Sequence, residues 1–184
     1  MKKYLIFLSL VSLLSAGEVV SSGEVFVNGK ILDKTTKIKR GDTIETKANS
    51  SIRFNVANDA FSAKSNSKFK LESLGSKKIL NVINGGVLSV FGKGNHEVVT
   101  PNMTAGIRGT GTYTLVKDGK TYFCTCYGHT EVVAHGETKD LKATHHNMIW
   151  VTKDKIKASK IMEGHTDDEL RILEKMVGRT VPFD

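Results

Sequence analysis

Two cysteines, Cys124 and Cys126, are the residues of this chain whose type and spacing suit chemistry most clearly. They are its only cysteines, and they lie in a run of β-forming residues. Residues two apart in a strand point to the same face, with Cβ atoms about 6.6 to 6.8 Å apart. A disulfide needs Cβ atoms about 3.5 to 4.5 Å apart, so it would require distortion. Two thiolates of a tetrahedral metal site lie about 3.7 Å apart, which the side chains can reach by leaning together.

Histidines downstream of the cysteines could complete such a metal site. Two thiolates with one or two imidazoles suit zinc or a copper ion, and zinc with four protein ligands would be structural. Consecutive strand residues face opposite ways, so at most one of His145 and His146 should reach the cysteines unless the pair lies in a turn. The histidines available as ligands are His129, His135, His145, His146 and His165. We expect one ion on both cysteines, His165, and either His145 or His146.

The cysteine pair could also have a role that needs no metal. Cysteine is among the most buried residue types, so the two side chains could simply be core, or be linked by a disulfide. A redox-active dithiol is a further alternative. Cys-x-Cys is also a weaker signal than two spaced Cys-x-x-Cys pairs. His96 lies upstream of the hairpin, and we expect it at the surface of a strand.

The elements that must position these residues are strands. Between Glu24 and Val151 apolar residues alternate over short runs, and turn-forming residues interrupt them about every 8 to 12 residues, which is typical of an all-β sandwich, barrel or solenoid. Around the cysteines, residues 112–116 and 121–127 should form two strands joined by a turn that contains Asp118-Gly119. Thr100-Pro101 should begin a strand, because proline is tolerated there.

One helix is predicted, within residues 165–178. Thr166 and Glu169 form a capping box, the first turn is acidic, and Gly178 lies where a helix commonly ends. An isolated helix of this length is marginal in water, so its apolar face should dock on the β domain. That face consists of Leu170, Leu173 and Val177, with Met176 beside them. Residues 153–184 are therefore expected to be a linker, rich in lysine at its start, followed by a docked amphipathic helix.

The N-terminal residues have the pattern of a secretory signal peptide. Lys2-Lys3 precedes an apolar stretch from Tyr4 to Leu14, and small residues follow at Ser15-Ala16-Gly17. The stretch is shorter than the roughly 20 apolar residues that span a bilayer, and no second candidate occurs. We expect residues 1–17 to be removed on export, residues 18–152 to form one β domain, and the mature protein to be periplasmic without a transmembrane segment.

Turn residues around the cysteine hairpin form a recognisable pattern. It comprises Thr100-Pro101, residues 105–110 with the core Ile107-Arg108-Gly109-Thr110, and a hairpin ending at Gly128, with residues 40–46 and Gly85-Gly86 upstream. This pattern resembles the FecR-type domain, the periplasmic part of FecR-family signalling proteins, over roughly residues 23–133. The resemblance implies a twisted β-solenoid-like or sandwich-like fold with a sensory or interaction role. The Cys-Thr-Cys-Tyr-Gly string at 124–128 departs from the general domain.

The sequence favours a non-enzymatic function. It has no Gly-x-Ser-x-Gly, His-Glu-x-x-His, phosphate-loop or haem-attachment motif. The net charge of +8 is scattered over the chain without a recognisable nucleic-acid motif, so nucleic acid is not an expected partner. We expect an envelope protein or polymer as the partner, with metal binding as the alternative function. FecR relays its signal through an N-terminal cytoplasmic domain and an internal membrane span. We expect neither part in this chain, so anti-sigma activity is not expected.

Arg108 is the other candidate binding residue, because it lies at a corner flanked by glycines. Its guanidinium could contact an anion or a partner. It could instead satisfy carbonyl groups that the irregular turn leaves exposed. Both roles are open from the sequence.

Overall fold

The computed structural model describes residues 17–184, so nearly all of the expected signal peptide lies outside the described residues. The fold is all-β with a single C-terminal helix, as the sequence predicts. The strands are β1 Val19–Ser22, β2 Val25–Val27, β3 Lys30–Ile31, β4 Thr43–Thr46, β5 Ser51–Val56, β6 Asp59–Ala63, β7 Lys68–Leu74, β8 Lys77–Val90, β9 Asn95–Thr100, β10 Met103–Lys117, β11 Lys120–Ala134, β12 Glu137–Ala143, β13 Asn147–Val151 and β14 Ile156–Ser159; the helix is α1, Asp167–Met176.

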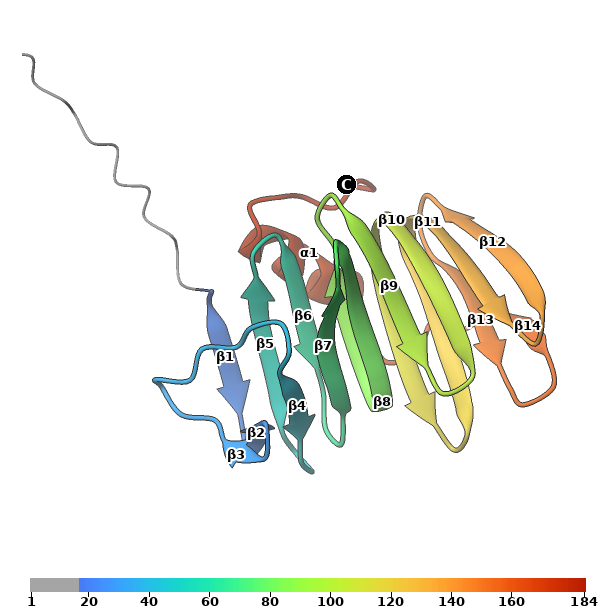
Figure 1. Cartoon of the computed structure of the whole chain (residues 1–184). Coiled ribbons are helices and arrows are strands. Elements are labelled where there is room, and N and C mark those ends of the chain that lie inside the picture. The colour runs from blue at the N-terminus through green and yellow to red at the C-terminus, as the bar shows by residue number, and fades with distance from the viewer. Residues whose placement is uncertain (1–16) are drawn as a thin grey trace, which may run out of the picture.

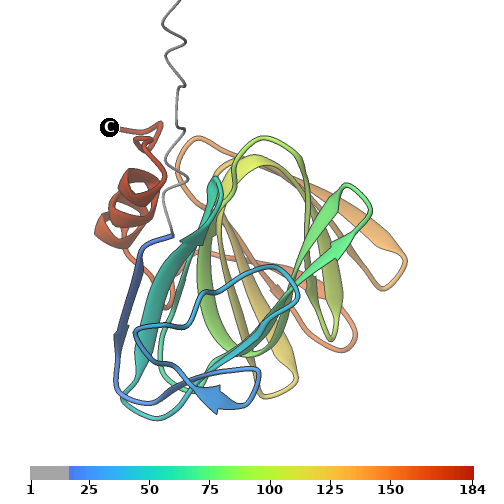
Figure 2. The ribbon, with the colours of Figure 1, turned by 60° about the vertical axis from the view of Figure 1, so that its left-hand side comes forward.

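The strands form one sheet that bends around its own core without closing into a barrel (Figures 1 and 2). Its main path runs β14-β13-β11-β10-β9-β8-β7-β4-β2-β3. The neighbouring strands are antiparallel, except that β8 and β9 run parallel. The long strand β10 pairs with β9 over its first half and with β8 over its second half. The long strands β8, β10 and β11 therefore form the middle of the sheet.

Both faces of these central strands are buried. One face turns toward the inside of the bend, where aromatic and aliphatic side chains such as Phe54, Phe69, Leu80 and Phe123 form the larger apolar cluster. The opposite face is covered by α1 and the residues that follow it. This second cluster consists of Ala60, Leu88, Val90, Tyr113, Tyr122, Cys124, Cys126, Tyr127, Leu170, Leu173 and Val181. Both cysteines thus lie beneath the C-terminal segment rather than inside the main core.

The hairpin that carries the cysteines has the predicted turn. Asp118 and Gly119 have φ angles of 50° and 69°, the conformation that an Asp-Gly hairpin turn requires, and Lys117 pairs with Lys120. The glycine-rich corner is a break in the β10–β11 register between Arg108 and Gly111. The expected strand start at Thr100-Pro101 is wrong: Thr100 ends β9 and Pro101 lies in the turn that follows.

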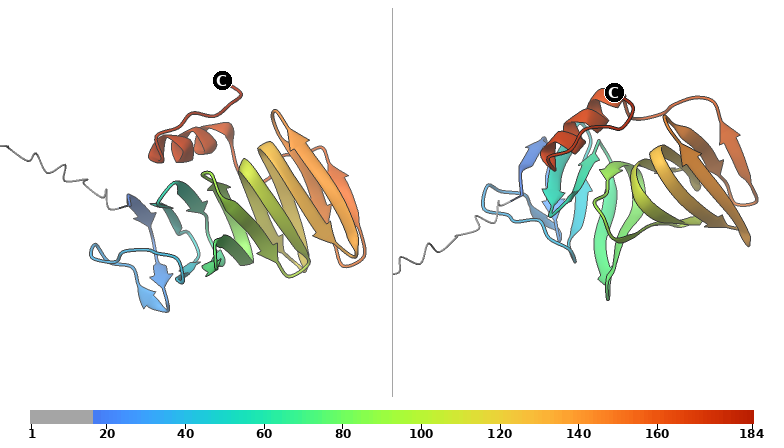
Figure 3. Two further views of the ribbon diagram at one scale, coloured as in Figure 1. Left: turned by 45° about the horizontal axis from the view of Figure 1, so that its top comes forward. Right: turned by 90° about the horizontal axis from the view of Figure 1, so that it is seen from above.

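Helix α1 has the predicted capping box, with the Thr166 side chain bonded to the Glu169 backbone and the Glu169 side chain bonded back to Thr166. Its buried side chains Leu170 and Leu173 face β8, β6 and β5, so the helix lies across the outer face of the sheet (Figure 3). The segment expected to be a linker also contains a strand, β14, which pairs with β13. Within residues 17–184 no helix is long and apolar enough to cross a membrane.

Candidate metal centre

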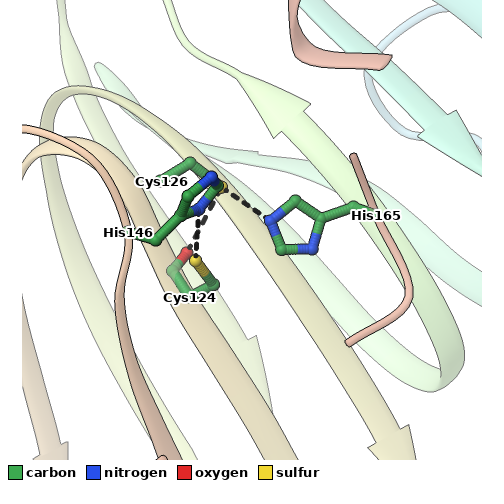
Figure 4. Close-up of side chains that lie close together, drawn as sticks. All are labelled: Cys124, Cys126, His146 and His165. Atoms are coloured by element: carbon green, nitrogen blue, oxygen red, sulfur yellow. Dashed lines mark hydrogen bonds between the residues drawn. The ribbon is translucent and has the colours of Figure 1, made fainter. Parts of the chain in front are cut away.

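Four side chains that can bind a metal meet between β11 and the start of α1. Cys124, Cys126, His146 and His165 each offer one ligand atom, and these four atoms lie within 4.8 Å of one another. The Cys124 sulfur is 3.3 Å from Nδ1 of His146, and the Cys126 sulfur is 3.4 Å from Nε2 of His165 (Figure 4). We call these four residues the Cys/His cluster. Ligand atoms of a tetrahedral zinc site are about 3.3 to 3.8 Å apart, so only a small contraction would be needed.

The two cysteines face the same way because β11 is extended at this point. Cys124 pairs with Tyr113 of β10 on one side and with Met148 of β13 on the other, so it occupies the middle of the sheet. Thr125 between them points to the opposite face, where its hydroxyl is bonded to that of Thr130 at 2.6 Å. Both cysteines have no exposed surface and form no disulfide.

His146 reaches the cysteines because the histidine pair lies in a bend between β12 and β13 rather than in a strand. Its φ angle is 51°, which is uncommon for a residue other than glycine. Its backbone N–H donates to the carbonyl of Cys126 at 2.8 Å, so the bend is attached to the strand that carries the sulfurs. Of the two alternatives left by the sequence, His146 faces the cysteines and His145 does not.

Each histidine of the cluster is oriented by a hydrogen bond on its far side. Nε2 of His146 lies 2.8 Å from a carboxylate oxygen of Asp167, and Nδ1 of His165 lies 2.8 Å from the carbonyl oxygen of Glu163. Carboxylate and carbonyl oxygens only accept, so these ring nitrogens carry the protons. Whenever a ring is neutral, its other nitrogen, the one that faces a sulfur, has a lone pair that a metal can accept. Metal-binding histidines are commonly oriented in this way.

The segment before α1 is held by two tyrosines of the sheet. The Tyr122 hydroxyl donates to the carbonyl of Ile161 and accepts from the N–H of Glu163. The Tyr113 ring stacks on His165, with 4.6 Å between ring centroids. These contacts fix the imidazole of His165 above β11 before the helix begins.

Two glycines make room for the Tyr113 side chain. Gly164 has a φ angle of 73°, and a Cβ atom there would lie 2.0 Å from the Tyr113 hydroxyl oxygen. A Cβ at Gly86 in β8 would lie 2.2 Å from the same oxygen. A larger residue at Gly164 would therefore displace the chain immediately before His165.

The ionisation of the cluster is set by its own members. Hydrogen bonding with Cys126 lowers the pKa of Cys124 against the effect of burial, and the two imidazoles lower it further. Burial raises the pKa of Cys126, and the neighbouring Cys124 sulfur adds to that rise. The hydrogen bond to Cys124 raises the pKa of His146, again against burial, with help from Asp167. Without a metal, these shifts favour a thiolate on Cys124 that accepts from a protonated His146, and a thiol on Cys126. A bound metal would replace the proton between Cys124 and His146.

The other sequence candidates lie outside the cluster. His145 bonds to Asp167 at 3.0 Å and packs on the ring of Phe183, so it supports the carboxylate behind His146. His129 pairs with Asp140, and His135 bonds to a backbone carbonyl at the surface. Arg108 is exposed, and its side chain forms no hydrogen bond within residues 17–184, so the described structure does not show it satisfying carbonyl groups.

The expectation that His96 is a surface residue is wrong. Its side chain is fully buried in β9, and its ring lies 3.0 Å from the carboxylate of Asp59, which is 1% exposed. Arg40 reaches the same carboxylate at 2.5 Å and Lys78 at 3.7 Å. We call Asp59, His96, Arg40 and Lys78 the Asp59 cluster. β9 lies between β8 and β10, so alternate residues of β9 point into the core, and His96 can do so because an acid meets it there.

Several residues that build the site were missed from the sequence. Asp167 appeared only as one acid of the first helical turn, and Tyr113 and Gly164 were not selected. The sequence feature that could have indicated Asp167 is its position two residues after His165. Once the helix docks, this position brings Asp167 close to His145 and His146. Gly164 directly before a candidate ligand could also have indicated a close backbone approach.

Comparison with known proteins defines the fold but not a family. No family model and no curated protein sequence matches the chain. It is similar to two crystal structures, at 1.65 and 2.50 Å resolution, of a putative anti-sigma factor from Parabacteroides distasonis, with TM-scores of 0.57 and 0.56 and 11% sequence identity. The match covers 64% of this chain and 58% of the other, so it spans less than two thirds of that protein. At this identity the likeness is one of fold alone.

Proposed function

We propose that this protein is an exported, non-enzymatic domain that binds one metal ion through Cys124, Cys126, His146 and His165. The observation that carries the proposal is that one ring nitrogen of each imidazole already faces one of the two sulfurs. Asp167 and the Glu163 carbonyl hold the rings in that orientation from behind. A bound cation would accept all four lone pairs.

The ligand set favours zinc, with copper as the second choice. Two thiolates and two imidazoles in a tetrahedral arrangement are typical of zinc, whereas copper sites more often use other geometries. The four residues are mostly buried: the cysteines have no exposed surface, and His165 is 5% exposed. A metal with four protein ligands has no position left for substrate, which supports a structural or sensory role rather than catalysis.

Such an ion would connect three segments that are far apart in the sequence. The cysteines belong to β11, His146 to the bend before β13, and His165 to the segment that enters α1. Metal binding would therefore fasten the C-terminal helix to the outer face of the sheet. Metal occupancy would then determine how firmly that face is covered.

Metal analysis and thiol titration of one preparation of purified protein test this proposal. We expect about one zinc or copper ion per chain and two thiols that react only after chelation. Metal-free protein after metal-replete expression, with two buried reduced thiols, would show that the cysteines are core residues. Reversible oxidation of the pair without metal would instead indicate a redox dithiol.

A second candidate function is a sensory or interaction module of the FecR type. It is supported by the sequence resemblance and by the similarity of fold to a protein described as a putative anti-sigma factor. The partner would be an envelope protein or polymer, and nucleic acid is not proposed. Cell fractionation with N-terminal sequencing tests the periplasmic location, since an intact N-terminus in the membrane fraction would contradict export with cleavage.

A further inference from the structure

A groove of about 560 Å³ lies beside the Cys/His cluster, and the proposed function does not use it. After α1 the chain returns along the upper edge of the sheet in Figure 1, and Thr180, Pro182 and Phe183 form one wall of the groove. The opposite wall is the register break of the β10–β11 hairpin, where Gly109 and Gly128 lie. A volume of this size is within the range of small-molecule sites.

The walls of the groove are mainly apolar. Phe91, Tyr127 and Phe183 contribute aromatic rings, and Ala143 and Pro182 contribute smaller apolar surfaces. The glycines of the register break add backbone without side chains, so the groove stays open where the regular pairing of β10 and β11 is interrupted. Apolar walls with few polar groups are typical of sites that bury most of a small ligand.

The charges of the groove favour an anionic group on the ligand. Glu174 is 2% exposed, and its carboxylate is bonded to the Tyr127 hydroxyl and to Arg179 at 2.5 Å, so the one acid in the wall is already neutralised. Lys93, at the rim, is exposed and forms no salt bridge within residues 17–184. The uncompensated charge at the groove is therefore positive, on a chain with a net charge of +8.

We propose that this groove binds a small apolar molecule that ends in a single carboxylate. The apolar body lies between Phe91, Tyr127 and Phe183, and the carboxylate lies at the rim near Lys93. No residue of the groove belongs to the Cys/His cluster, so the proposal stands or falls separately from metal binding. The two sites are neighbours through Phe183, whose ring centroid lies 6.4 Å from that of His146 and 4.4 Å from that of His145.

Three ligands with the same ten-carbon chain test the proposal: decanoate, decanol and decylamine. Their binding to the purified full-length protein is measured by calorimetry, with and without a chelator. We expect decanoate to bind at least about tenfold more tightly than decylamine, a factor that corresponds to one good charge interaction. The preference for decanoate over decylamine should persist with chelator, even where loosening of the C-terminal wall lowers both affinities.

Matched variants locate the binding. Ala143→Trp fills the groove from a partly exposed edge strand and should weaken the binding of decanoate at least about tenfold. Thr138→Trp, at an exposed position of the same strand, should leave the affinity for decanoate unchanged. Lys93→Glu should weaken the binding of decanoate but not that of decanol. Lys117→Glu, at the hairpin turn, should change the affinity for neither ligand. Absence of decanoate binding up to its solubility limit, or binding unchanged by Ala143→Trp, overturns the groove as the site. Equal affinity for decanoate and decylamine would contradict the proposal that the ligand carries a carboxylate.

Discussion

Two buried groups of ionisable side chains differ in how their charges are satisfied. In the Asp59 cluster, one carboxylate receives the guanidinium of Arg40, the ring of His96 and the backbone N–H of Gly92. In the Cys/His cluster, ring nitrogens face sulfur atoms, and within residues 17–184 no carboxylate or ammonium group lies between them. The first group is a set of donors around one acceptor carboxylate, and Nδ1 of His96 is left without a partner. The second is a set of electron-pair donors around one point, which is the arrangement that a cation satisfies.

The largest effect should come from Cys126→Ser. Removal of one thiolate from four ligands should abolish tight metal binding, and the stabilisation that metal gives the wild-type protein, of order several kcal/mol, should disappear. Elemental analysis and thermal melts with and without chelator measure both effects. His135→Ala is a suitable control, because that histidine is at the surface; His96 is unsuitable, because it is buried against Asp59. Metal retained by the Cys126→Ser variant would contradict the assignment of Cys126 as a metal ligand.

The next largest effect should come from Asp59→Asn. It leaves the half-buried Arg40 and the buried His96 without their charged partner, and breaking a buried pair in this way costs about 3 to 5 kcal/mol. Urea denaturation measures the loss. Metal content should stay at the wild-type value, because the Asp59 cluster shares no residue with the Cys/His cluster. A variant that lost metal while remaining folded would show that the two clusters are coupled.

Acid should also weaken the Asp59 cluster. Burial raises the pKa of Asp59, but hydrogen bonds from His96 and Gly92, with the charges of His96 and Lys78, outweigh it and lower the pKa from 3.8 to about 2. A lowered folded-state pKa contributes stability above the unfolded pKa, and this contribution, about 2 kcal/mol, is lost as the pH falls from about 4 to about 2. The difference in urea midpoint between wild type and Asp59→Asn should shrink over that range. A difference in urea midpoint that stays constant with pH would contradict the lowered pKa of Asp59.

A smaller effect should follow from Asp167→Asn. The amide still contacts His146, but the carboxylate that makes the imidazole a stronger ligand is removed. Loss of such a partner lowers metal affinity about 10- to 100-fold. Competition with a chromophoric chelator measures the affinity. Asp168→Asn removes the same charge from the same helical turn without touching a histidine, so equal loss in both variants would assign the effect to the helix terminus instead.

The smallest effect should come from Thr166→Ala, which removes the side-chain cap of α1 at a cost of about 0.5 to 2 kcal/mol. Thermal melts and limited proteolysis of the C-terminal segment measure it. If metal fastens the helix, the loss should be larger in metal-free protein than in metal-loaded protein. The same loss in both states would separate helix capping from the cluster.

Local patterns could be predicted from the sequence because local rules decide them. The Asp118-Gly119 turn and the Thr166–Glu169 capping box depend on residues within one turn, and both are confirmed. The alternation that puts Cys124 and Cys126 on one face is equally local. These features were enough to propose a candidate site on the strand that carries the cysteines and to connect it with the C-terminal helix, and the structure brings Cys124, Cys126 and His165 together there.

Contacts between distant segments could not be predicted in the same way. His96 is buried because Asp59, 37 residues earlier in the chain, contacts it in the folded sheet. No residue near His96 in the sequence indicates that partner. The choice between His145 and His146 depended on a bend with a φ angle of 51°, which residue types alone do not specify. The strand β14 was missed because its lysines resemble a solvated linker, and only pairing with β13 makes it a strand.

The position of His165 after every strand in the sequence has a consequence for the order of assembly. A chain that emerges with its N-terminus first presents Cys124 and Cys126 well before the two histidines that should accompany them. During that interval the sulfurs lie on a sheet face that α1 has not yet covered. Until α1 has docked, the thiols therefore lack the cover that Leu170 and Leu173 give them in the folded protein. Docking of the helix provides that cover, so folding of the last segment also sets the time at which the cysteines become protected.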